Sequence, residues 1–278
     1  MERPVNEILS SGKPDFPFML CWANENWTRA WDGGIQNILI KQNYTEEDDR
    51  NHIKYLLDNV FKDSRYIRID NKPVFAVYRS SLFPNINRTL EIWREEAKKR
   101  NVELYLCRFE SFNESGEELL NVGFDAAIEF PPHNIGIYKK KYKPISHFFN
   151  AISYRIFGFN LLKNTFDYKW YVKESIKSAI PPYKRYNCIT PMWDNTARKR
   201  KNYFILKGST PELYKELLTT LLKKFKPYSK EENLFFINAW NEWAEGNHLE
   251  PDLKWGRQYL EATKEAIAAC QTNETSTD

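Results

Sequence analysis

The feature that most constrains this sequence is a regular alternation of short apolar runs with longer amphipathic segments. Six runs, rich in aromatic and branched residues, have the length of buried strands: 16–23, 73–78, 102–109, 124–130, 187–193 and 234–240. Helical patterns are predicted at about 45–60, 89–100, 114–121, 166–178, 211–225 and 255–270. Strands that alternate with helices form a parallel sheet covered by helices, so the sequence predicts an α/β fold.

The chain length agrees with one large unit of this kind. A (β/α)8 barrel takes about 250 residues, and the chain has 278, of which 42% are hydrophobic and 28% charged, a composition that excludes a disordered protein. We therefore predict a single (β/α)8 TIM-barrel-type catalytic domain over residues 1–270, followed by a disordered tail over 271–278.

Polar and aromatic residues follow the ends of the predicted strands. In parallel α/β folds, ligands bind at the carboxyl ends of the strands. Indoles stack on the C–H faces of sugar rings, while amides, guanidinium groups and carboxylates bind the hydroxyls, so this mixture indicates a carbohydrate site. The predicted substrate-binding residues are Trp22, Asn24, Glu25, Asn26, Trp27, Arg29, Tyr78, Arg108, Glu110, Glu129, Trp193, Asp194, Asn195, Arg198, Trp240, Asn241, Trp243, His248 and Glu250. The alternative for the cluster at 22–32 is a structural loop in which Arg29 pairs with Glu25 or Asp32.

The run after the last strand concentrates carboxylates. Glu242, Glu245 and Glu250 lie within nine residues. Chemistry at a glycosidic bond uses two carboxyl groups in different protonation states. A helical turn would place Glu242 and Glu245 on one face, and Gly246 would let the chain bend there. We predict Glu242 and Glu245 as catalytic residues; the alternative is an ordinary polar loop between strand and helix.

Other function classes lack their sequence signals. There is no glycine-rich nucleotide loop of Walker or Rossmann type, the four cysteines lie far apart, and the net charge is only +4. We therefore predict no metal, no cofactor and no nucleic-acid partner. The first thirty residues contain no signal peptide or membrane span, which favours a cytoplasmic location.

Residues 136–186 interrupt the alternation. This insertion contains eleven Lys and Arg against two acidic residues, and thirteen aromatic residues. A solvated lid is one interpretation. The other is a surface that contacts an anionic membrane or a lipid-linked sugar, which would hold the protein at the inner face of the membrane.

Three motifs in order resemble the WbsX-type glycosyltransferase family of bacterial surface-polysaccharide clusters. They are WANENWTR at 22–29 with WDG at 31–33, WDNTAR at 193–198, and NAWNEWAEG at 238–246. That family is related to glycoside hydrolase family 99, the endo-α-mannosidases and endo-α-mannanases. The resemblance covers nearly the whole chain and is weakest over the basic insertion.

The resemblance implies a (β/α)8 barrel, an oligosaccharide or polysaccharide substrate, and no metal. It assigns Glu242 as the base that deprotonates the sugar 2-hydroxyl, giving a 1,2-anhydrosugar with retention, and Glu245 as the acid on the leaving oxygen. The acid role requires a raised pKa at Glu245. Ala244 stands where the hydrolases often have His, which bears on substrate identity more than on chemistry.

Family members usually begin with two further βα units. The six strands would then be strands three to eight of an N-terminally truncated barrel with exposed sheet edges. Three functions remain open: a glycosyltransferase of O-antigen or capsule biosynthesis, a family 99-like endo-acting hydrolase, and a truncated chain that only binds glycans or is inactive. A two-domain nucleotide-sugar transferase is a weaker alternative.

Overall fold

The structure is a computed structural model that describes residues 3–29, 34–110, 115–132, 149, 152–153, 155–156, 165–199 and 203–274. The motif at 31–33, most of the basic insertion at 136–186 and the last four residues lie outside these ranges. Within them, no helix is long and apolar enough to cross a membrane.

The six predicted strands form a parallel arrangement in chain order. β1 (Leu20–Trp22), β5 (Lys72–Val77), β6 (Tyr105–Glu110), β7 (Ala126–Glu129) and β9 (Arg185–Tyr186) lie side by side. After Asn187 the segment of β9 continues as β10 (Cys188–Ile189), and β10 pairs in parallel with β13 (Phe236–Ile237). The predicted parallel α/β arrangement is confirmed. In the described ranges β1 and β13 do not pair with each other, so no closed barrel forms there.

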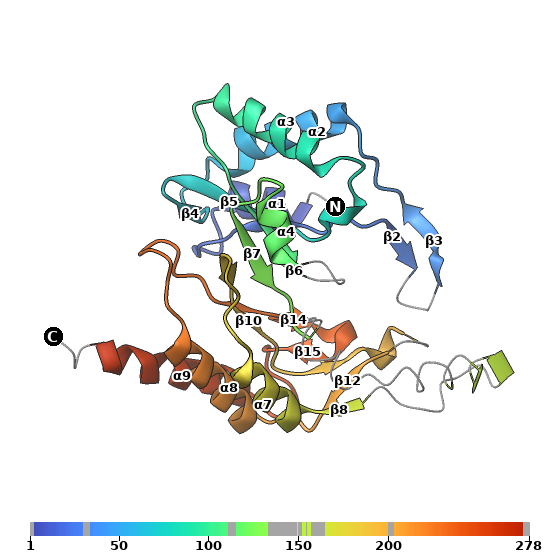
Figure 1. Cartoon of the computed structure of the whole chain (residues 1–278), viewed down its shortest axis with the longest axis vertical. Helices are drawn as coiled ribbons and strands as arrows, with labels where there is room; N and C mark the ends of the chain where they lie inside the picture. Colours follow the sequence, from blue (N-terminus) through green and yellow to red (C-terminus); the bar gives the residue numbers. More distant parts are fainter. Residues whose placement is uncertain are drawn as a thin grey trace.

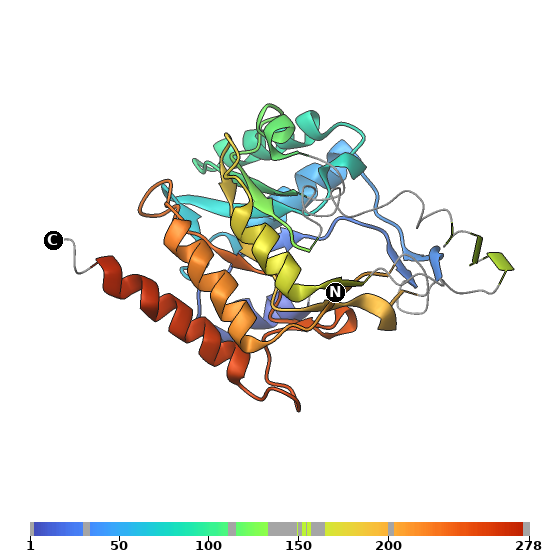
Figure 2. The same ribbon diagram turned by 60° about the horizontal axis from the view of Figure 1, so that its bottom comes forward.

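The helices form two groups on the outside of the sheet (Figures 1 and 2). One contains α1 (Arg3–Ser11), α2 (Glu46–Tyr55, continued by a π-helical turn over Leu56–Val60), α3 (Ile86–Lys98) and α4 (Gly116–Leu120). The other contains α7 (Tyr168–Lys177), α8 (Pro211–Lys224) and α9 (Gln258–Glu274). The predicted helices are confirmed, although α9 runs beyond residue 270 to Glu274, and α1 is unpredicted. Thr45, Asn85, Asp167 and Thr210 cap their helices by accepting a hydrogen bond from the backbone N–H three residues later.

Side chains alternate between the two faces of the sheet, as the pleat of a strand requires. On β6, Tyr105 and Cys107 join the inner cluster with Ile128 of β7, whereas Leu106 joins the outer cluster with Trp93 of α3. A third cluster lies among α7, α8 and α9. This alternation decides which strand-end residues face the interior.

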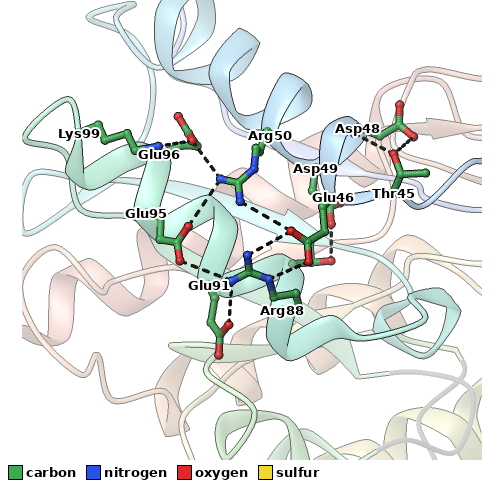
Figure 3. Close-up of polar contacts among 11 residues, drawn as sticks. Thr45, Glu46, Asp48, Asp49, Arg50, Arg88, Glu91, Glu95, Glu96 and Lys99 are labelled. Atoms are coloured by element: carbon green, nitrogen blue, oxygen red, sulfur yellow. Dashed lines mark hydrogen bonds and ion pairs between the residues drawn. The ribbon is translucent and has the colours of Figure 1, made fainter.

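Helices α2 and α3 are also joined by an ion-pair network on their outer surface (Figure 3). Arg88 contacts Glu46, Glu91 and Glu95 at 3.0–3.5 Å. Arg50 lies 3.2 Å from Glu96, a carboxylate that is only 3% exposed. Isolated exposed pairs contribute little to stability, but a shared network fixes the two helices together.

The remaining strands are short and belong to hairpins and small sheets that the sequence pattern does not predict. They are β2 (Trp27–Arg29) with β3 (Gly34–Ile40), β4 (Arg68–Ile69) beside β5, β11 (Trp193–Asp194) with β12 (Ile205–Lys207) and β8 (Thr165–Asp167), and β14 (Asn241–Glu242) with β15 (Asn247–His248). Most have two or three residues, too few for a periodic signal.

Candidate active site

The β14–β15 hairpin carries both predicted catalytic carboxylates and lies beside the carboxyl end of β7 (Figure 1). Asn238, just after β13, donates its side-chain amide to the Pro131 carbonyl at 2.7 Å. The buried Asn247 side chain donates to the Asn238 carbonyl and accepts from the Thr190 hydroxyl, at 2.9 and 3.0 Å. These bonds join the hairpin to the ends of β7, β10 and β13.

Gly246 closes the 3₁₀ turn Trp243–Glu245 inside this hairpin. Its φ is +53°, a left-handed conformation that favours glycine. A Cβ atom at this position would lie 2.9 Å from the Asp194 carbonyl oxygen. Both the backbone conformation and the close approach of the Asp194 backbone therefore require glycine.

Glu242 and Glu245 face the same guanidinium group. Nη1 of Arg198 lies 3.6 Å from Oε1 of Glu242 and 3.3 Å from Oε1 of Glu245. Glu242 is the last residue of β14 and Glu245 is the last residue of the turn that follows, so the short turn between them lets both side chains reach Arg198. Arg198 follows the turn Asn195–Ala197, which packs against the turn of the carboxylates.

The two carboxylates have different environments. The Glu245 side chain is 19% exposed and that of Glu242 is 44% exposed. Burial is the main cause that raises the pKa of Glu245; the Arg198 charge opposes this, and the Glu242 charge adds to it. Glu245 therefore holds its proton to higher pH than an ordinary glutamic acid, as a general acid must.

Trp243 is fixed beside this pair. Its ring stacks on the His248 ring with 3.7 Å between centroids and 16° between planes, and its Nε1 donates to Glu250 at 2.6 Å. The His248 ring in turn bonds to Asp252 at 2.9 Å. Asn241 is exposed in β14, opposite His248, and Trp240 is about half exposed. Asp252 is not among the site residues predicted from the sequence.

The cluster after β1 is mainly structural at its centre. The Asn24 side chain is fully buried and exchanges hydrogen bonds with the Arg79 backbone, accepting at 2.8 Å and donating at 2.7 Å, so it joins the ends of β1 and β5. Glu25 is part-exposed and pairs with the Arg79 guanidinium at 2.6 Å. The Asn26 side chain accepts from the Gln42 backbone at 2.8 Å. Trp27 and Arg29 are exposed on β2.

Tyr78 lies within electrostatic range of both the cluster after β1 and the β14–β15 hairpin. Burial raises its pKa well above the usual value, and the negative charges of Glu25 and then Glu245 raise it further. Its ring contacts Phe130 and Phe109 with centroids 5.2 and 6.2 Å apart. These three rings follow the inner-face positions of β5, β6 and β7. Neither phenylalanine is among the site residues predicted from the sequence, although strand alternation places both on the inner face with Tyr78.

Three strand-end residues lie on the opposite face. Glu110 accepts from Arg185 and from the Gly116 backbone, each at 3.2 Å, and Glu129 lies 3.7 Å from Arg185. Arg108, on the same face of β6 as Glu110, is fully buried. Because alternate side chains of a strand face opposite sides, these residues lie on the helix side of the sheet, away from the inner face that carries Tyr78.

Four further predicted residues support the fold locally. Trp193 is 2% exposed in the core beneath α7–α9, and Trp22 packs against His52 and Phe83 on the α2–α3 side. Asn195 is buried and accepts from the Phe204 backbone at 2.8 Å, while Asp194 accepts from Thr196. The structure thus brings together Arg198, Glu242 and Glu245, with Trp243, His248 and Glu250 beside them, and places the indoles of Trp22 and Trp193 in packed cores.

No three His, Cys, Asp or Glu side chains of the described ranges form a group that could hold a metal ion. All four cysteines are free thiols; Cys107 and Cys188 are buried, as expected of small apolar residues in strands, whereas Cys21 is exposed.

Comparisons with known proteins agree with the motifs. The glycosyltransferase WbsX family matches residues 1–263. The uncharacterized protein WxcX of Xanthomonas campestris pv. campestris strain B100 is 30% identical over 269 residues, which are 96% of this chain and 37% of that protein. WxcX of a second strain of this pathovar matches to the same extent. The chain therefore spans little more than a third of the length of these curated relatives.

Solved structures resemble the chain in fold. A glycoside hydrolase-like protein aligns with a TM-score of 0.51 and 14% identity over 80% of this chain and 60% of its own. The GH99 endo-α-mannosidase of Bacteroides thetaiotaomicron aligns with a TM-score of 0.49 and 15% identity over 84% and 65%. On the family match, which extends over 263 of the 278 residues, the chain belongs to the glycosyltransferase WbsX family.

Proposed function

We propose that this chain is the catalytic part of a carbohydrate-active enzyme that forms an α-glycosidic bond during the synthesis of bacterial cell-surface polysaccharide. The proposed unit is one domain over residues 1–270 with an insertion at 136–186. One observation carries the proposal: Glu242 and Glu245 share Arg198, and burial raises the pKa of Glu245. Family membership supplies the substrate class.

The proposed reaction has two steps. Glu245 gives its proton to the leaving oxygen as the C1–O bond breaks, while Glu242 takes the proton of the 2-hydroxyl, whose oxygen attacks C1 to form a 1,2-anhydrosugar. An acceptor hydroxyl then attacks C1 and opens this ring; Glu245 receives the acceptor proton and Glu242 returns its proton to O2. Two inversions at C1 give net retention, and both carboxyl groups end in their starting forms. Arg198 holds the two side chains toward the reacting centre.

The test uses an oligosaccharide labelled at its non-reducing end, so that the label follows the transferred glycosyl group, incubated with the protein and with Glu242→Gln and Glu245→Gln variants. General acid–base catalysis contributes about 10²- to 10⁴-fold, so each variant is expected to lose at least about a hundredfold in rate. Glu91→Gln, on the exposed surface of α3, is the matched control and keeps full activity. Full activity in folded Glu242→Gln or Glu245→Gln protein would contradict the mechanism.

The products of the same incubation separate the candidate functions. Longer labelled chains indicate transfer to a sugar, and shortened chains with free sugar indicate hydrolysis of the family 99 type. Binding by calorimetry without any product indicates a glycan-binding protein, and a chain without a cooperative melt indicates an inactive fragment.

The basic insertion is the basis for a membrane contact in the same proposal. Its eleven Lys and Arg against two acids, with thirteen interleaved aromatics, suit an anionic membrane surface or a lipid-linked sugar. Flotation with liposomes measures this: retention is expected to rise with the fraction of anionic lipid and fall with salt. Retention that is indifferent to anionic lipid would remove the membrane contact from the proposal.

A further inference from the structure

The indole of Trp243 is held by two contacts on different parts of the ring. His248 covers one face at 3.7 Å, and Glu250 accepts the ring N–H at 2.6 Å. The residue nevertheless remains 49% exposed. An immobilised aromatic ring with one covered and one open face is a flat, preorganised apolar surface, and it costs little further entropy when a ligand binds to it.

A second layer fixes the ring beneath the indole. The Asp252 carboxylate bonds to the His248 ring at 2.9 Å. Its other oxygen accepts backbone N–H groups from Lys254 and Trp255 at 2.8 and 2.5 Å, and the Gly256 N–H donates to the Asp252 carbonyl at 2.8 Å. Asp252 is therefore locked in its own tight turn and holds the orientation of His248.

The position of this stack relative to the carboxylates suggests its use. Trp243 follows Glu242 directly and is the first residue of the turn that ends at Glu245. In the proposed reaction Glu245 handles the proton of the leaving and the attacking oxygen, so the sugar next to Glu245 is the one that carries these oxygens.

We propose that the open face of Trp243 is the binding subsite for the acceptor sugar, and that Asp252 is a positioning residue that acts through His248. This inference rests on the proposed function. The ligand is a pyranose with C–H groups along one face, which stacks on the indole while its hydroxyl reaches C1 of the donor. Aromatic stacking of this kind contributes enough to change an affinity by about three- to tenfold.

The experiment measures transfer from the labelled oligosaccharide to added methyl pyranosides (mannoside, glucoside, galactoside) at varied acceptor concentration. Trp243→Ala is expected to raise the acceptor KM about tenfold while the donor KM stays constant. Asp252→Ala is expected to raise the acceptor KM about threefold without lowering kcat at saturating acceptor. Tyr55→Ala, which removes an exposed aromatic side chain of α2 whose hydroxyl bonds to Asn6, is the matched control and leaves both constants unchanged.

Two further outcomes keep the inference falsifiable. If Trp243→Ala does not fold, Trp243→Phe keeps an aromatic face but loses the bond to Glu250, and is expected to show a smaller rise in acceptor KM. An unchanged acceptor KM in a folded Trp243 variant would overturn the subsite while inactive Glu245→Gln still supports the proposed function. Active Glu245→Gln would instead overturn the proposed function itself, and the two failures are therefore distinguishable.

Discussion

Replacement of Gly246 by alanine tests how the turn Trp243–Glu245 is built. Two penalties act at this position. A left-handed backbone conformation costs a non-glycine residue about 1–2 kcal/mol, and Gly246 has φ +53°. The new Cβ would also meet the Asp194 carbonyl oxygen at 2.9 Å and the Asp194 nitrogen at 3.1 Å, and these are backbone atoms that cannot rotate away. Overpacking of this kind costs about 1–3 kcal/mol, so we expect a total destabilisation of about 2–5 kcal/mol.

Gly256 provides the matched control. Its φ is +54°, nearly that of Gly246, but a Cβ there would meet nothing within 4 Å. Urea unfolding of Gly246→Ala and Gly256→Ala therefore separates the two penalties, because both variants share the backbone strain and only Gly246→Ala has the steric conflict. Equal losses of unfolding free energy would refute the argument that the approach of Asp194 determines this turn. The transfer assay adds a second measurement, since displacement of Glu245 from Arg198 lowers the rate.

Three other predictions address the carboxylate pair and the buried polar residues. Arg198→Met removes a positive charge that lowers the pKa of Glu245. Activity that needs protonated Glu245 falls as pH rises through this pKa, so the alkaline limb of the kcat/KM profile is expected to move to higher pH. A move to lower pH would contradict the acid role. Asn24→Ala leaves buried backbone groups of Arg79 without partners and is expected to lower the unfolding free energy by about 2–3 kcal/mol in urea titrations. Arg185→Met leaves Glu110 as an uncompensated charge on the helix side of the sheet and is expected to cost about 3–5 kcal/mol of stability; altered oligosaccharide affinity in calorimetry would argue against this structural role.

The parallel order of the strands could be predicted because each central strand carries a dense apolar run. The run 73–78 corresponds to β5, which is buried on both faces from Pro73 to Val77. This stretch is apolar throughout, so it identifies a strand but does not show which side chains face the interior. The helices could be predicted equally well, because Thr45 and Thr210 are N-cap residues that show where α2 and α8 begin. Both signals are local, so they can be recognised without knowledge of tertiary contacts.

The side on which each strand-end residue lies could not be predicted in the same way. Three predicted residues, Tyr78, Arg108 and Glu110, lie at or near the ends of strands, but only Tyr78 is on the inner face of the sheet. The face on which a side chain lies can be assigned once the register between the strands is known. The β14–β15 hairpin escaped prediction because two-residue strands have no periodicity. Its position depends on Asn247 and Gly246, whose partners Thr190 and Asp194 lie more than fifty residues away in the sequence.

The compactness of the β14–β15 hairpin bears on how chains with this segment can diversify. One short, contiguous segment supplies both proposed catalytic carboxylates and the indole beside them, and much of the hairpin is held by its own bonds, such as those from Leu249 and Glu250 to the Trp240 carbonyl. Loops that do not contact the hairpin, unlike the segments at Pro131, Thr190 and 194–198, can therefore change in length and composition without disturbing these carboxylates. Under the proposed function, selection for a new substrate could then act on those loops while the hairpin stays unchanged.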